Sequence, residues 1–116
     1  MKLYVISGLG ADKTVFENIV FPEKFSEIIF IDWLIPETEE TFEHFVKRMA
    51  KPIEEKEKFC LLGYSFGGIM VQEINKLKPA EKIVILGSIK SQKEMSVTFH
   101  LAKKSKIFSK IPESYF

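Results

Sequence analysis

The chain has 116 residues, enough for one domain, and its 46% apolar and 28% charged residues are typical of an ordinary globular protein. A formal net charge of +1 excludes a strong overall field for nucleic acid or an anionic membrane. The single cysteine, Cys60, cannot form an internal disulfide, and no stretch approaches the roughly 20 apolar residues of a membrane span. We therefore expect a cytoplasmic protein that has neither nucleic acid nor a membrane as its partner.

Four continuous apolar runs divide the chain, and the segments between them have helical patterns. The runs are residues 3–6, 28–31, 59–62 and 83–86, and the expected helices are about residues 13–20, 38–53 and 66–78. Continuous runs are typical of parallel strands that are buried on both faces. The alternation of strands and helices predicts an α/β protein, with a parallel sheet of about four strands flanked by helices.

The helical pattern is clearest in residues 38–53. Its apolar residues recur at the spacing of a single helix face: Phe42, Phe45, Val46, Met49 and Ile53. Glutamates gather at its start and basic residues at its end, as the helix dipole prefers. His44 falls on the opposite face of this helix, so we expect its side chain at the surface.

The turn Gly63-Tyr64-Ser65-Phe66-Gly67 follows the third apolar run and opens the third helix. The pattern G-x-S-x-G in that position places a serine on a tight strand-to-helix turn, with its hydroxyl exposed. Glycines two residues before and after the serine remove side chains that would clash in the turn. We identify Ser65 as a candidate nucleophile; a glycine-rich turn with a spectator serine is the alternative.

With this motif, residues 1 to about 90 resemble the α/β-hydrolase superfamily. The resemblance implies an oxyanion hole made by the backbone N–H groups of Leu9 and Phe66, where Leu9 lies in the loop that follows the first strand. Ser7 stands in that loop where the family usually has a histidine. If the strands order as second, first, third, fourth, this loop and Ser65 face each other across a crevice between the first and third strands.

The turn Gly8-Leu9-Gly10 also matches the start of a dinucleotide-binding fingerprint. The third glycine of that fingerprint is replaced by Lys13, so a lone G-x-G remains. We expect neither a nucleotide cofactor nor a metal ion.

A serine nucleophile needs a general base, and the family places its acid and histidine later in the chain than the serine. The two histidines here are His44 and His100. His100 falls in residues 91–116, which we interpret as the start of a helical lid after the hydrolase core of residues 1–90. His100 is a candidate base, but we favour the interpretation of His100 as a solvated surface histidine. We expect the sequence to be the N-terminal half of a longer hydrolase, which leaves the fourth strand as an apolar edge open to self-association.

These observations predict a serine hydrolase that acts on a small-molecule carboxylic ester, thioester or related acyl substrate. A non-catalytic hydrolase-like binding module, which keeps the crevice and lacks the base, is the alternative. A third hypothesis keeps the enzyme and has another polypeptide complete its site. A reactive Ser65 distinguishes the enzyme from the binding module.

Overall fold

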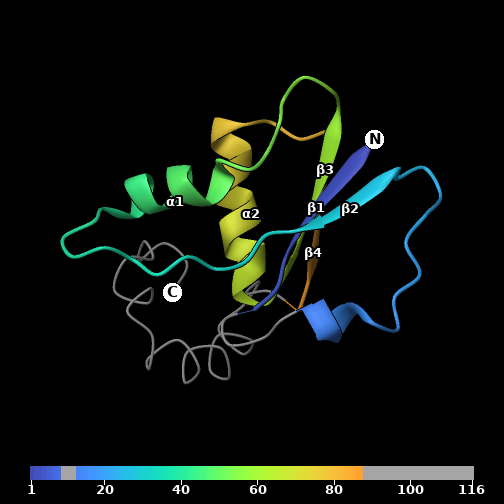
Figure 1. Cartoon of the computed structure of the whole chain (residues 1–116), viewed down its shortest axis with the longest axis horizontal. Coiled ribbons are helices and arrows are strands. Elements are labelled where there is room, and N and C mark those ends of the chain that lie inside the picture. Colours follow the sequence, from blue (N-terminus) through green and yellow to red (C-terminus); the bar gives the residue numbers. More distant parts are fainter. Residues whose placement is uncertain (9–12, 88–116) are drawn as a thin grey trace.

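A computed structural model describes residues 1–8 and 13–87 of the chain (Figure 1). Its four strands are β1 (Lys2–Ile6), β2 (Glu27–Phe30), β3 (Phe59–Tyr64) and β4 (Lys82–Leu86). They form one parallel sheet in the order β2-β1-β3-β4. The predicted α/β class is confirmed, and the strand order is the one that opens a crevice between the carboxyl ends of β1 and β3.

Two α-helices, α1 (Phe42–Ala50) and α2 (Phe66–Leu77), lie on the same side of the sheet in Figure 1. Their apolar faces meet the side chains of Tyr4, Ile6 and Leu61 in the larger core cluster. The stripe predicted for the middle helix belongs to this core: Phe45, Val46, Met49 and Ile53 are buried, and Phe42 packs against them. Leu77 is the last residue of α2 and is 45% exposed.

The opposite face of the sheet carries Leu3, Val5, Cys60 and Leu62, which pack with Phe16 in a second cluster. Phe16 ends a short 3₁₀ turn, η1 (Lys13–Phe16), and the predicted helix over residues 13–20 is wrong. The segment is rich in β-branched residues, which favour helices weakly, and Pro22 follows it closely. Bonds from the backbone N–H groups of Glu17 and Ile19 to carbonyls three residues earlier give the tighter turn instead.

Helix α1 is shorter than the predicted range 38–53 because local signals stop it at both ends. Glu39 has a φ of 62°, which no α-helix allows, and the Thr41 hydroxyl then accepts a hydrogen bond from the His44 N–H as an N-cap. Pro52 lies just beyond its other end. Ile53 still reaches the core, although it lies outside the helix.

The central strands β1 and β3 are almost completely buried, as their continuous apolar runs predicted. The outer strands differ: Val84 and Leu86 of β4 are 42% and 37% exposed, while Ile83 and Ile85 pack toward the helices. In the described sheet, β4 is therefore an edge strand with an apolar exposed face. None of the described helices is long and apolar enough to cross a membrane.

Candidate functional site

Ser65 lies between the last residue of β3 and the first residue of α2, as the motif predicted. Its backbone has φ 57° and ψ −121°, outside the regions that L-residues favour. The serine side chain makes no capping hydrogen bond to α2, although serine at this position is usually a cap. Ser65 is half-buried and lies in a strained turn at the carboxyl end of β3. Its hydroxyl has no hydrogen-bond partner in the helix.

Gly63 and Gly67 are required by close backbone approaches within the turn. A Cβ added at Gly63 would lie 2.3 Å from the carbonyl oxygen of Gly67. A Cβ added at Gly67 would lie 2.0 Å from the carbonyl oxygen of Ile6 and 2.7 Å from that of Ser7. These atoms are backbone and cannot move aside, so both positions accept only glycine. The two glycines bring the start of α2 directly against the end of β1.

Gly8, which follows β1, lies directly against Ser65, which follows the neighbouring strand β3. A Cβ added at Gly8 would lie 3.1 Å from the Ser65 Cβ and 3.5 Å from its Oγ. The pairing of Ile6 with Gly63 in the sheet places the chain beyond β1 at this position. The expected juxtaposition of the first loop with the nucleophile turn is thus present as far as Gly8. Leu9, the expected oxyanion donor of that loop, lies outside the described residues.

Phe66, the other expected donor, is the first residue of α2 and has a buried side chain. Its backbone N–H belongs to the first turn of the helix, where N–H groups lack intrahelical acceptors and the helix dipole favours negative charge. The Ser65 N–H is engaged elsewhere, since it donates to the Leu86 carbonyl oxygen at 2.9 Å. The Phe66 N–H is therefore suitably located to stabilise negative charge beside Ser65.

Trp33, which follows β2, contacts the same region. Its indole Nε1–H donates to the Ser7 carbonyl oxygen at 2.7 Å. The sequence held one signal for this contact. Trp33 follows β2 at the carboxyl end of the strands, where Ser65 also lies, and a half-buried indole N–H usually finds an acceptor.

His44 is exposed, as predicted, and its ring Nδ1 lies 2.5 Å from Oε2 of the buried Glu40. The Glu40 carboxylate also accepts from Arg48 at 2.8 Å and from the Glu37 N–H at 3.0 Å. Burial alone raises the pKa of the Glu40 carboxyl, but the hydrogen bonds from Glu37, His44 and Arg48, with the Arg48 charge, outweigh it and hold that pKa below its ordinary value. His44 thus belongs to a network at the start of α1, and His100 lies outside the described residues.

Donor atoms of Glu37, Glu40 and His44 lie within 4.8 Å of one another, a spacing compatible with a metal ion. The Arg48 guanidinium already contacts both carboxylates, at 2.8 Å from Glu40 and 3.7 Å from Glu37. This cluster is therefore an ion-pair network whose positive charge comes from arginine.

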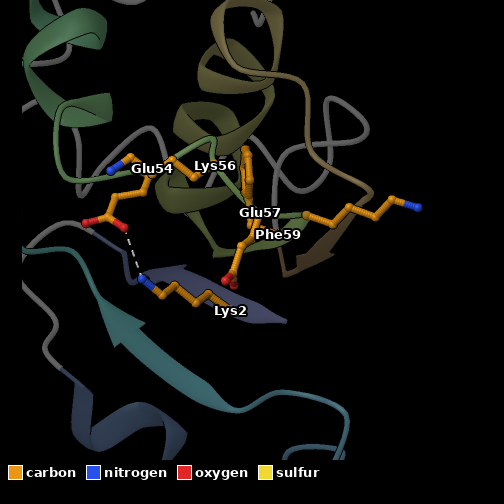
Figure 2. A pocket seen from close by; sticks show the side chains of 6 residues that line it. Lys2, Glu54, Lys56, Glu57 and Phe59 are labelled. Atoms are coloured by element: carbon orange, nitrogen blue, oxygen red, sulfur yellow. Dashed lines mark hydrogen bonds and ion pairs between the residues drawn. The ribbon is translucent and has the colours of Figure 1, made fainter.

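Figure 2 shows a cavity beside the start of β1. Ser65 follows the end of β3, so the cavity and Ser65 lie at opposite ends of the parallel strands. The lining of the cavity includes Lys2 and Phe59, the first residues of β1 and β3, and the Lys2 ammonium lies 3.2 Å from the Glu54 carboxylate. The cavity has a volume of about 90 Å³. Small-molecule sites usually have roughly 300 Å³ or more, so this cavity is not a candidate substrate site.

Comparison with known proteins adds no relative: no family model matches the chain, and no curated protein matches it.

Proposed function

We propose that this chain carries the nucleophile and oxyanion side of a serine hydrolase of the α/β-hydrolase type, acting on a carboxylic ester, thioester or related acyl substrate. The observation that carries the proposal is the backbone of Ser65, with φ 57° and ψ −121° between a strand and a helix. Strain of this kind costs on the order of 1–3 kcal/mol and persists where function requires the geometry.

In the proposed reaction, the Ser65 hydroxyl attacks the acyl carbonyl carbon while a general base takes its proton. The carbonyl oxygen becomes an oxyanion, which the Phe66 N–H at the start of α2 stabilises. The Leu9 N–H is the second donor in this proposal. Each such donor contributes on the order of 3 kcal/mol to transition-state stabilisation. Collapse of the oxyanion then breaks the bond to the alcohol or thiol, which leaves with the proton held by the base. Attack of water on the acyl-serine, with the same base taking and returning a proton, releases the acid and restores Ser65.

The general base of the proposal is a histidine. Among the described residues the histidine is His44, whose Nδ1 is already engaged with Glu40 at the start of α1. The remaining histidine of the chain is His100. We therefore assign the base either to His100 or to a histidine outside the given sequence, which lies later in a longer chain or in another chain.

The test is labelling of the purified chain with a fluorophosphonate probe, which reacts with activated serine hydroxyls. We expect labelling of the wild type and none of Ser65→Ala. Ser26→Ala serves as the matched control, because Ser26 is an exposed serine far from the turn, and it should label as the wild type does. His100→Ala then tests His100 as the base, since labelling of the wild type that is lost in His100→Ala assigns the base to His100.

Absence of labelling in a folded wild-type chain would contradict His100 as the base and leave two possibilities, an incomplete hydrolase whose base lies outside the given sequence or the non-catalytic binding module. That module keeps the crevice and has an ordinary serine hydroxyl.

A further inference from the structure

We infer that Trp33 is a positioning residue of the proposed site, which holds the Ser7–Gly8 peptide in place opposite Ser65. This inference rests on the proposed function of Ser65. It starts from the 2.7 Å hydrogen bond that the Trp33 indole Nε1–H donates to the Ser7 carbonyl oxygen. That bond joins the segment after β2 to the segment after β1, at the carboxyl end of the strands, where Ser65 also lies.

The Ser7 carbonyl is confined from two sides. On one side is the Trp33 donor. On the other is Gly67, where an added Cβ would lie only 2.7 Å from the same oxygen. A carbonyl held between a hydrogen-bond donor and a close backbone cannot rotate without losing the bond or meeting α2. The orientation of the Ser7–Gly8 peptide is therefore fixed by these two contacts.

The orientation of this peptide matters because it is planar and trans, so the Gly8 N–H points away from the direction of the Ser7 carbonyl. Gly8 is also the residue whose added Cβ would lie 3.1 Å from the Ser65 Cβ. Any rotation at Ser7 thus changes what the nucleophile faces. Shifts of about 1 Å in such groups can reduce reaction rates by roughly a hundredfold.

The indole itself is held in place by packing. The Trp33 ring stacks on the ring of Phe45 of α1, with centroids 6.4 Å apart and planes 14° apart. Phe45 is completely buried in the core between α1 and the sheet. The donor is consequently fixed by the hydrophobic core, while its acceptor lies at the candidate site. Trp33 is the single tryptophan of the chain, so its fluorescence reports on this position alone.

The experiment replaces the donor and keeps the ring. Trp33→Phe preserves an aromatic ring on Phe45 and loses the N–H. The second variant substitutes β-(3-benzothienyl)alanine at position 33, an isostere of tryptophan with sulfur in place of the N–H. It covers the case in which Trp33→Phe folds poorly. Amide NMR resonances of Gly8 and Ser65 are compared with that of Cys60, which lies in the buried interior of β3. Fluorophosphonate labelling rates are measured on the same samples.

We expect the Gly8 and Ser65 amide resonances to move in both variants while that of Cys60 stays in place, and labelling to slow by about tenfold or more. We also expect phosphonylation of wild-type Ser65 to change the Trp33 emission. A merely structural tryptophan would lower the thermal midpoint without displacing the Gly8 resonance selectively. Unmoved Gly8 resonances, or an unchanged labelling rate in a folded variant, would overturn the inference.

The two proposals fail in different ways. A wild-type chain that does not label contradicts a complete catalytic site in this polypeptide, and with it any effect of Trp33 on labelling. The Gly8 resonance still decides whether Trp33 orients the peptide. A wild-type chain that labels, together with variants that label equally fast, contradicts the inference alone.

Discussion

Gly67 lies so close to Ile6 that a Cβ on Gly67 would come within 2.0 Å of the Ile6 carbonyl oxygen. This approach brings the first turn of α2 against the end of β1, and it explains why the residue two positions after Ser65 is a glycine. The same contact sets how near the loop after β1 comes to the serine.

Gly67→Ala should therefore destabilise the fold severely. The clashing atoms belong to the backbone of β1, which is paired on both sides and cannot shift. We expect the free energy of unfolding to fall by about 3 kcal/mol or more in urea denaturation. Gly8→Ala is the matched control with a smaller loss, since its nearest neighbour is a serine side chain. A Gly67→Ala protein with wild-type stability would contradict the geometry of the turn.

Gly8→Ala should act on Ser65 rather than on the fold. The added methyl would lie 3.1 Å from the Ser65 Cβ, which is tight enough to force the serine side chain to adjust. We expect fluorophosphonate labelling to slow by about tenfold or more, while the thermal midpoint changes little. If labelling is as fast as in the wild type, Gly8 does not face the reactive hydroxyl.

Ser65→Gly should be more stable than Ser65→Ala. Glycine adopts the backbone angles φ 57° and ψ −121° without the penalty that a Cβ brings, whereas alanine keeps the strain of the serine. We expect the glycine variant to exceed the alanine variant by about 1 kcal/mol in the free energy of unfolding. Neither variant should label with the probe. Equal stabilities would show that the turn is unstrained.

Lys78 should stabilise the end of α1. Its Nζ donates to the carbonyl oxygens of Ala50 and Ile53, at 2.9 and 2.8 Å, and so joins the end of α2 to the end of α1. Lys78→Met keeps an unbranched apolar side chain and removes the charged donor. We expect a loss of about 1–3 kcal/mol in the free energy of unfolding. Lys76→Met is the control, because Lys76 lies in the last turn of α2, is exposed and pairs with Glu73. Similar losses in both variants would argue against this role of Lys78.

Glu40 should give the fold part of its sensitivity to acid. Because its pKa is held below the ordinary value of 4.5, its contribution to stability is complete at neutral pH and is lost as the pH falls below that value. The groups that face it are Glu37, His44 and Arg48. We expect the thermal midpoint of Glu40→Gln to be lower than that of the wild type near neutral pH and to fall less between about pH 6 and pH 3.5.

The control for this titration is Glu39→Gln, which removes one carboxylate at an exposed position next to Glu40. If the thermal midpoints of the wild type and Glu40→Gln fall equally as the pH is lowered, the buried carboxylate does not couple folding to pH.

The sequence alone determined the elements whose signals are local. Continuous apolar runs located all four strands to within about two residues. The central strands β1 and β3 are buried on both faces, so no polar position interrupts their runs. The motif around Ser65 located the turn, because a strand-to-helix reversal in so few residues leaves only glycine on either side. The helix over residues 13–20 was predicted wrongly, because its weak helical pattern competed with β-branched residues and a nearby proline.

Only the tertiary structure decided which distant groups meet. The contact of Trp33 with Ser7 joins segments whose separation in sequence carries no period or motif. It depends on the order of the strands, which places β1 beside β2 and so brings the segments that follow these two strands together. Side-chain chemistry can be read residue by residue, but the partner of a hydrogen bond is fixed by packing.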